Sequence, residues 1–351
     1  MANLCVGLDI GSSAIKAVML EQSRRGTRLV HFGIEYLHAQ TIVDGAVMDR
    51  AAVVEAIGRL KSALGIGNRP VATAISGHSV IVKKIQLPAM SREQIAERIP
   101  TEAEQHIPFK RDEVDLDYQV APSKNTPGQL DIILVAAKKE MIADYLQVIR
   151  DAKLQPAVLD VAAFSLQNAF EAAYGEPGGH GAVALVHIGN AITHVNVVSD
   201  GASIFVRDVA IGGGAFTEEI QRRLRLSHED AEHVKVSGGR DGEPVPAGLD
   251  AVIDEVAEST VNKIQRSIDF FLATANDVKL TRLLLSGGSA HLGALARQFE
   301  QRVEVPVEVM DPFRRTAVDP TKLEPAFVHE HAAEAAVAFG LALRRPGDGD
   351  R

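Results

Sequence analysis

The alternation of apolar and polar residues predicts an α/β protein that begins with a β-hairpin. Apolar runs at 6–10 and 14–20 flank a Gly-Ser-Ser turn at 11–13, and two apolar runs around such a turn are typical of a hairpin. Apolar residues then recur at helical spacing over 53–64. Strand-like runs and amphipathic stretches alternate along the rest of the chain, which indicates a mixed α/β fold.

A second segment repeats the frame of this hairpin in the other half of the chain. An apolar run again meets a small polar turn, now at 189–191, and apolar residues return after it. A repeat near half the chain length predicts two related halves that face each other across a cleft. The matched pairs are Asp9 with His187, Gly11 with Gly189, Ser12 with Asn190, and Lys16 with His194.

The first hairpin carries the groups that a nucleotide phosphate needs. The backbone N–H groups of Gly11, Ser12 and Ser13 can approach a phosphate closely, because no large side chain stands in the way. The Asp9 carboxylate can hold a hydrated Mg²⁺, and Lys16 can bring its ammonium to the phosphate oxygens. The hairpin therefore predicts a phosphate site with Asp9 as the metal ligand.

Composition and charge narrow the classes of protein that fit. The chain has 351 residues, of which 46% are hydrophobic, and a net charge of −9. That charge disfavours nucleic acid or an anionic membrane as the main partner. No apolar run approaches the ~20 residues that span a bilayer, and no signal peptide is visible. Cys5 stands alone, so we expect no intrachain disulfide and a reducing, cytoplasmic compartment.

Glycine- and serine-rich turns follow predicted strands at 11–13, 189–191, 212–214 and 287–289. The last two precede predicted helices, whose N-termini favour anions. Together the turns resemble the actin-like ATPase superfamily, with the hairpins as its two phosphate loops. In this resemblance, 283–289 is similar to the adenosine motif and 334–342 to the hinge helix between the lobes. The resemblance implies an actin-like two-lobed fold with internal duplication, and ATP and Mg²⁺ as cofactors.

Three segments narrow the resemblance to one family. The stretches 87–91, 102–109 and 115–118 resemble the PilM family, the cytoplasmic actin-like proteins of type IV pilus machines, and the likeness extends over roughly 4–343. It implies a small SHS2-like α+β insertion in the first lobe. The implied divisions are 1–86 and 157–181 for the first lobe, 87–156 for the insertion, 182–328 for the second lobe with a nucleotide-capping subdomain at about 215–278, 329–345 for the C-terminal hinge helix, and 346–351 for a polar tail.

The resemblance also implies which residues contact the nucleotide. The segment 229–235 is similar to the nucleoside-contacting helix, where Glu232 and Lys235 lie three residues apart on one helix face. The pair could bond the ribose or cover the base, or it could be an ordinary surface ion pair. No catalytic residue is assigned. The implied ATP contacts are Gly11, Ser12, Ser13, Lys16, Gly189, Asn190, Gly213, Gly214, Glu232, Lys235, Gly287, Gly288 and Ser289, with Mg²⁺ at Asp9.

His187 departs from the superfamily pattern, because the second phosphate loop usually carries an aspartate there. A carboxylate at this position helps to orient the hydrated metal and the attacking water, whereas neutral imidazole is a poor ligand for Mg²⁺. His187 could accept a proton from water, or it could simply be satisfied by local hydrogen bonds. We expect ATP hydrolysis to be slow or absent.

The PilM resemblance implies an ATP-binding adaptor of the pilus assembly platform. It would dock the N-terminal tail of a PilN-like membrane protein in a groove between the insertion and the first lobe, bordered by Arg98, Glu102 and Phe109. It would then lie at the inner membrane through PilN and other platform proteins, with only indirect membrane contact and no nucleic-acid partner. A homo-oligomer is left open.

The alternatives differ in what else they require. An FtsA-like division protein ends in an amphipathic membrane helix, whereas residues 344–351 carry no apolar face. A type II secretion platform protein would carry its own membrane span. A sugar kinase of the same fold would need a positioned aspartate base and a sugar pocket. A chaperone would need a further substrate domain.

Overall fold

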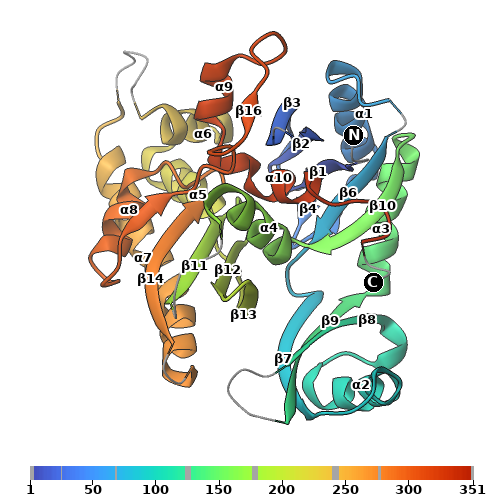
Figure 1. The fold of residues 1–351 in the computed structure, drawn as a ribbon. Helices are drawn as coiled ribbons and strands as arrows, with labels where there is room; N and C mark the ends of the chain where they lie inside the picture. Colours follow the sequence, from blue (N-terminus) through green and yellow to red (C-terminus); the bar gives the residue numbers. More distant parts are fainter. Residues whose placement is uncertain are drawn as a thin grey trace.

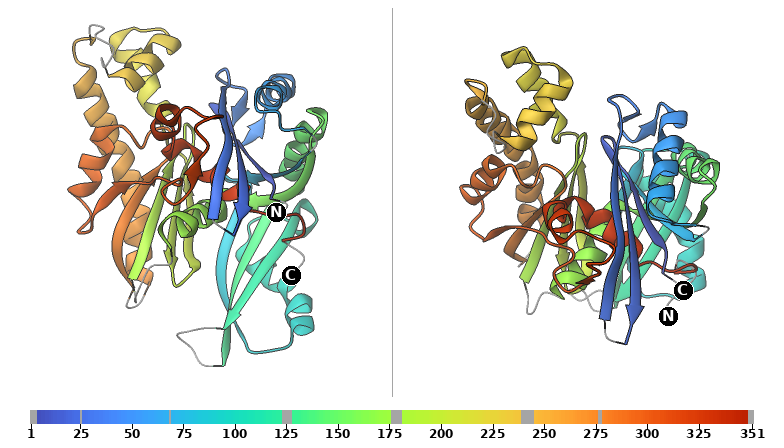
Figure 2. Two further views of the ribbon diagram at one scale, coloured as in Figure 1. Left: turned by 45° about the horizontal axis from the view of Figure 1, so that its top comes forward. Right: turned by 90° about the horizontal axis from the view of Figure 1, so that it is seen from above.

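The computed structural model describes residues 4–24, 26–67, 69–122, 128–175, 181–238, 245–275 and 278–348. The chain folds into two lobes side by side, with a smaller subdomain projecting from the first (Figure 1). Each lobe is built on a twisted sheet with helices packed on it, and the views in Figure 2 show the two sheets facing each other. No helix in the described part of the chain is long and apolar enough to cross a membrane.

The first lobe contains a mixed sheet with the strand order β10-β6-β1-β2-β3-β16. Its central strand β1 pairs antiparallel with β2 and parallel with β6. Helices α1 (Arg50–Ala63) and α3 (Lys139–Asp151) contribute to one apolar core with this sheet. The strands are β1 (Val6–Ile10), β2 (Ala14–Ser23), β3 (Gly26–Tyr36), β6 (Pro70–Ile75), β10 (Gln155–Val161) and β16 (Ala317–Val318), and β4 (Ile42–Val43) and β5 (Ala46–Val47) form a short hairpin beside them.

The second lobe repeats this topology. Its sheet has the order β13-β12-β11-β14-β15, and β11 pairs antiparallel with β12 and parallel with β14, as β1 does with β2 and β6. The predicted α/β fold with an internal duplication is therefore confirmed. The elements are β11 (Gly181–Ile188), β12 (Thr193–Ser199), β13 (Ala202–Val209), α5 (Gly214–Leu224), α6 (His228–Ser237), α7 (Leu249–Thr274), β14 (Lys279–Ser286), α8 (Gly293–Glu300) and β15 (Val307–Val309).

The inserted subdomain has a sheet and a core of its own. Its sheet has the order β7-β9-β8, and one face packs against α2 around Ile95, Ile99 and Leu134. Helix α2 begins with a capping box, in which Ser91 and Gln94 exchange hydrogen bonds. The elements are β7 (Val80–Pro88), α2 (Arg92–His106), the 3₁₀ turn η1 (Arg111–Glu113), β8 (Val114–Pro122) and β9 (Gln129–Lys138).

The structure corrects the predicted bounds of this insertion. The expected boundary at 87 falls inside β7, which pairs with β9 from Val80 onward. At the other end, the α3 side chains Met141 and Tyr145 belong to the core of the first lobe. The autonomous sheet therefore spans 80–138 rather than 87–156. The expected boundary at 87 lies next to Pro88, which the strand contains as its last residue.

Helices α4 (Ala162–Tyr174) and α10 (Ala336–Ala342) lie between the two sheets and join them (Figure 1). One apolar cluster contains Phe170 of α4, Phe339 of α10, Val18 of the first sheet and Leu185 of the second. The predicted single helix over 329–345 is wrong. The structure has α9 (Pro325–Glu330), then a 3₁₀ turn η2 (Ala333–Ala335) and α10. The helix is interrupted at 331–332, between α9 and η2, and just after this break the carbonyl of Ala333 accepts the N–H of Gly287 at 2.8 Å.

Candidate functional site

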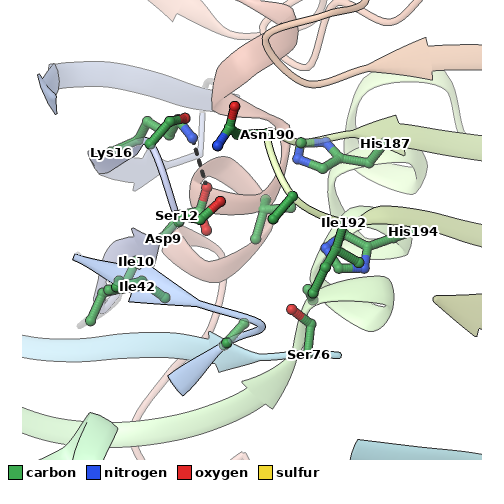
Figure 3. A pocket seen from close by; sticks show the side chains of 18 of the residues that line it. Asp9, Ile10, Ser12, Lys16, Ile42, Ser76, His187, Asn190, Ile192 and His194 are labelled. Atoms are coloured by element: carbon green, nitrogen blue, oxygen red, sulfur yellow. Dashed lines mark hydrogen bonds and ion pairs between the residues drawn. The ribbon is translucent and has the colours of Figure 1, made fainter. Parts of the chain in front are cut away.

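The two predicted hairpins face each other across a pocket (Figure 3). Asp9 stands opposite Lys16 on β1 and β2, and His187 stands opposite His194 on β11 and β12. The pairs Asp9–Lys16 and His187–His194 are therefore equivalent cross-strand pairs of the two duplicated hairpins. The pocket is lined by Asp9, Ile10, Gly11, Ser12, Ser13, Lys16, Ile42, Gly45, Ala74, Ser76, Tyr145, Ala162, His187, Gly189, Asn190, Ala191, Ile192, His194 and Val337.

The first hairpin places a cation and an anion at the floor of the pocket. Nζ of Lys16 lies 3.5 Å from Oδ2 of Asp9, and both side chains are largely buried. The turn between them is closed by the N–H of Gly11, which donates to the carbonyl of Ala14 at 3.1 Å. This tight turn leaves the serine tip facing the opposite hairpin (Figure 3). An anion can therefore meet both backbone N–H groups and an ammonium here.

His187 is buried and makes a local hydrogen bond. Its Nδ1 lies 3.0 Å from Oγ of Ser286, and its ring stacks on His194 with 5.8 Å between centroids. Burial lowers the pKa of His187 well below its usual value, and the positive charges of His194 and Lys16 lower it further. The side chain is therefore a neutral imidazole at pH 7, which gives the pocket no anionic metal ligand at this position.

The pKa of His194 is shifted in the opposite direction from that of His187, because an acid lies beside it. Its Nδ1 lies 2.6 Å from Oδ1 of Asp208. Burial opposes the charge on His194, but the Asp208 carboxylate outweighs burial and raises the pKa of the imidazole. Burial likewise opposes the charge on Asp208, yet the ion pair and a backbone N–H lower the pKa of that carboxyl. The raised pKa favours the protonated form of His194, so the second hairpin can present a cation to the pocket, as the first does with Lys16.

The turn at the start of α5 packs directly against the second hairpin. The N–H of Gly213 donates to the carbonyl of Gly189 at 2.8 Å, and that of Gly214 donates to the carbonyl of Asn190 at 2.9 Å. A Cβ atom on Gly213 would lie 2.4 Å from Oγ of Ser289. The structure therefore brings three segments that are distant in sequence to one edge of the second sheet.

The turn after β14 fits between the second hairpin and the hinge. Gly287 has φ +89°, and a Cβ atom there would lie 2.3 Å from the carbonyl oxygen of Ile188, so only glycine fits. Its N–H donates to the carbonyl of Ala333 at 2.8 Å. A Cβ atom on Gly288 would lie 3.8 Å from Oε2 of Glu334. The predicted adenosine-type turn is thus wedged against the interlobe connection.

Glu232 and Lys235 do more than form a surface ion pair. Nζ of Lys235 is buried and lies 2.7 Å from Oε2 of Glu232 and 3.0 Å from Oγ1 of Thr217. The hydroxyl of Thr217 in turn donates to Glu232 at 2.6 Å. Lys235 also donates to the carbonyl of Gly213 at 3.4 Å. The cluster ties α6 to α5 beside the glycine turn, so both predicted residues lie next to the site.

Seven of the predicted residues line the pocket between the hairpins, and they form the first group. Outside the pocket lining lie Gly213, Gly214, Glu232, Gly287, Gly288 and Ser289. Lys235 lines a second, shallower hollow with His291, Leu292 and Arg297. The first group is Asp9, Gly11, Ser12, Ser13, Lys16, Gly189 and Asn190.

Sequence reasoning missed several polar residues that complete the site. Ser76 and Tyr145 line the pocket from β6 and α3, Asp208 holds His194, and Thr217 holds Glu232. Tyr145, Asp208 and Thr217 belong to no glycine turn. Ser76 precedes Gly77 in the turn after β6, and this Ser-Gly pair repeats at 286–287 after β14, the matching strand of the second sheet. Asp208 stands opposite His194 on the neighbouring strand, as strand pairing could have shown.

The single carboxylate in the pocket lining suits an Mg²⁺ ion that is held mainly by phosphate. Among the described residues that line it, Asp9 is the only carboxylate, and no group of three metal-ligating side chains occurs in the described part of the chain. Mg²⁺ commonly uses one or two carboxylates plus substrate phosphates and water. The residues therefore fit a metal that arrives with a nucleotide rather than one caged by the protein.

Comparison with protein families gives one match that spans nearly the whole chain. Residues 7–346 match the model of the family described as type IV pilus assembly protein PilM. The match includes both hairpins, the inserted subdomain and the hinge. It decides against the FtsA-like, secretion-platform, sugar-kinase and chaperone alternatives.

Solved structures agree with the family match. The chain is similar to a structure titled PilM-PilN type IV pilus biogenesis complex, with 30% identity, a TM-score of 0.84, and coverage of 97% of this chain and 98% of that one. The fold is also shared with the ethanolamine utilization protein EutJ from Carboxydothermus hydrogenoformans, at 16% identity, a TM-score of 0.58 and coverage of 97% and 89%. A diol dehydratase-reactivating factor is 11% identical, with a TM-score of 0.52 and coverage of 98% and 99%.

Proposed function

The chain belongs to the PilM family of type IV pilus assembly proteins, and we propose that it acts there as an ATP-binding adaptor. In this role it binds ATP–Mg²⁺ between its lobes and docks the N-terminal tail of a PilN-like membrane protein. Its contact with the inner membrane is then made through that partner and other platform proteins.

One observation carries the nucleotide part of the proposal. Two equivalent hairpins place small-residue tips on opposite sides of one pocket, at Ser12-Ser13 and Gly189-Asn190. Each hairpin adds a cation, Lys16 on the first and His194 on the second. Backbone N–H groups and paired cations on both sides suit a chain of phosphates. Mg²⁺, when bound, would neutralise phosphate charge at Asp9.

The inserted subdomain supports the docking part of the proposal. It has its own apolar core, and β7 and the β9–α3 connection join it to the first lobe. Phe109 lies at this junction, where Nζ of Lys138 sits 5.0 Å from its ring centroid. Arg98 and Glu102 form an ion pair on the face of α2. An extended tail could pack apolar side chains against Phe109 and gain main-chain hydrogen bonds.

The partner is supported by similarity to a complex. The PilM-PilN structure covers 97% of this chain at 30% identity, so a PilN-like tail is the ligand to test first. The experiment is flotation with vesicles that display such a tail as a lipid-linked peptide. The protein should float with these vesicles and not with bare vesicles of the same lipids. Flotation with bare vesicles, or none with either kind, would contradict the docking role.

A point variant connects this result to the proposed groove. Phe109→Asp places a charge at the junction and should weaken tail binding at least tenfold, which corresponds to ~1.4 kcal/mol. Because Phe109 does not line the pocket between the lobes, ATP affinity should stay within twofold of wild type. Glu104→Asp, on the exposed face of α2, is a control that should change neither affinity.

A further inference from the structure

Asp208, at the end of β13, contacts both lobes with one carboxylate. Its Oδ1 lies 2.6 Å from Nδ1 of His194, on the second phosphate hairpin. Its Oδ2 accepts the backbone N–H of Gly77, in the first lobe, at 2.6 Å. The side chain is mostly buried, with 23% exposed. A short, shielded hydrogen bond to a carboxylate is among the stronger polar contacts in proteins, so this is a substantial link between the lobes.

Gly77 is fitted to that contact by its backbone. Its φ is +90°, which disfavours any residue with a side chain. A Cβ atom there would also lie 3.1 Å from Cδ1 of Ile192, at the tip of the second hairpin. The preceding Ser76 lines the phosphate pocket, and Figure 3 shows it next to Ile192. The segment 76–77 therefore lies directly against the hairpin that would hold phosphate.

The same segment is the root of the inserted subdomain. The carbonyl of Gly77 accepts the N–H of Val80, the first residue of β7, at 3.0 Å. The carbonyl of Ser79 accepts the N–H of Lys138, the last residue of β9, at 3.0 Å. Both strands that connect the insertion to the first lobe are thus tied within three residues of the Asp208 contact. A shift of Gly77 relative to the second lobe must change where the insertion points.

Phosphate in the pocket would act on the same link. The cations of Lys16 and His194 line the pocket from opposite lobes, and a polyphosphate between them would attract both. That attraction favours a closed arrangement of the lobes. The bond from Gly77 to Asp208 also requires the lobes to be close, because its two ends belong to different lobes. Phosphate binding and this bond therefore favour the same arrangement.

We propose that Asp208 is a positioning residue that couples occupancy of the phosphate pocket to the orientation of the inserted subdomain, and hence to tail binding. The inference rests on the proposed function, because it presumes that ATP and a PilN-like tail both bind. Coupling of this kind is reciprocal: ATP tightens the tail, and the tail tightens ATP by the same factor.

The test measures tail affinity with and without saturating ATP–Mg²⁺ in the full-length protein. In wild type, ATP should tighten the synthetic tail peptide by at least ~5-fold, the lower end of usual allosteric coupling. In Asp208→Ala the ratio should fall to about one, measured at ATP concentrations raised to saturate the variant, because loss of the carboxylate beside His194 also weakens ATP binding. The control Asp269→Ala removes the same charge from an exposed site on α7 of the same lobe, and it should keep the wild-type ratio.

A second measurement guards against a misfolded variant. Amide hydrogen exchange over 76–80 should speed up in Asp208→Ala and not in Asp269→Ala, while exchange within β11 stays unchanged. Asp208→Asn, which can keep one of the two hydrogen bonds, should lie between wild type and Asp208→Ala in both measurements. If both ligands bind and Asp208→Ala retains the wild-type ratio, the coupling proposal alone is overturned. If wild type fails to bind ATP or the tail, the proposed function is overturned and the coupling with it.

Discussion

Lys16 and Asp9 stand opposite each other on the first hairpin, with Nζ 3.5 Å from Oδ2. The pair occupies the same register position as His194 and His187 on the second hairpin. The duplication has therefore kept the backbone frame and changed the charges, with an acid–base pair in one lobe and two imidazoles in the other. This difference sets how each lobe can meet a metal ion or a phosphate.

Asp9→Ala should remove the stabilisation that ATP–Mg²⁺ gives to the protein. Asp9 is the carboxylate available to the metal in the pocket lining, and without it the phosphates lose their neutralising ion. Wild type should gain ~2.7 kcal/mol at ~100 times Kd, measured as a rise in the thermal unfolding midpoint. The matched control Asp115→Ala, exposed on β8, should keep that rise. An undiminished rise in Asp9→Ala would show that the metal is held elsewhere.

His187→Asp should raise ATP turnover. A carboxylate at this position can orient a hydrated metal, whereas the neutral imidazole hydrogen-bonded to Ser286 cannot. Wild-type turnover should lie below the ordinary enzyme range of ~1–1,000 s⁻¹, in a phosphate-release assay. The asparagine of His187→Asn has nearly the shape of aspartate but no charge, so this variant should leave turnover low. A wild-type rate inside the ordinary range would contradict this interpretation of His187.

Gly287→Ala should destabilise the second lobe and weaken ATP binding. The residue has φ +89°, and a methyl group would lie 2.3 Å from the carbonyl oxygen of Ile188. The left-handed conformation alone costs ~1–2 kcal/mol, and the contact with a backbone oxygen adds to it, so the loss in unfolding free energy should exceed ~2 kcal/mol. Chemical denaturation measures it.

The control for this variant is Gly58→Ala, within α1. A Cβ atom at Gly58 would have no atom outside its own helix turn within 4 Å, and alanine is favoured over glycine in a helix by ~0.5–1 kcal/mol. This substitution should raise the unfolding free energy. A destabilisation by Gly287→Ala that is no larger than ~0.5 kcal/mol would show that the turn can relax away from Ile188.

Replacing residues 84–133 by Asn-Gly should abolish tail recruitment and spare the nucleotide site. Lys83 and Leu134 are cross-strand partners on β7 and β9, and a two-residue Asn-Gly turn closes such a pair into a hairpin. The excision leaves α3 in place, and α3 belongs to the core of the first lobe. Vesicle flotation with the displayed tail reports recruitment, and the ATP-induced thermal shift reports the pocket. Full recruitment by the excised protein would place the tail site elsewhere.

The stability that Asp208 provides should depend on pH. The pKa of His194 is raised above 6.5, so its contribution is complete below 6.5 and is lost as pH rises through the folded value. The pKa of Asp208 is lowered below 3.8, so its contribution is complete above 3.8 and is lost as pH falls through the folded value. The ion pair therefore stabilises most between about pH 4 and 6.5.

Comparison of wild type with Asp208→Asn isolates this contribution. The difference in unfolding free energy should be ~1.5–3 kcal/mol near pH 5.5 and should shrink as pH rises above 6.5 and His194 loses its proton. Chemical denaturation over this pH range measures it. The neutral His187 is common to both proteins, so its own pH dependence cancels. A difference that stays constant up to pH 9 would show that His194 is not charged in the folded protein.

Local sequence determined the hairpins and the glycine turns of this protein. An apolar run, a Gly-Ser tip and a second apolar run close a hairpin through short-range bonds such as that from Gly11 to Ala14. The repeat of this frame around Gly189 predicted the duplicated lobes, because both hairpins obey the same local rules. Asp9 and Lys16 could be paired in advance for the same reason, since strand register follows from the length of the turn.

The tertiary structure alone decided where the insertion begins, how the hinge is broken and what lies beside His194. Helix α3 joins the first lobe because its apolar face finds the sheet there, which no local pattern distinguishes from packing in the insertion. The hinge is interrupted between α9 and η2, and just after this break the carbonyl of Ala333 accepts the N–H of Gly287, 46 positions earlier in the chain. Asp208 reaches Gly77 across 131 positions of sequence. Such contacts join segments that become neighbours only when the lobes pack, so their partners are set by the fold as a whole.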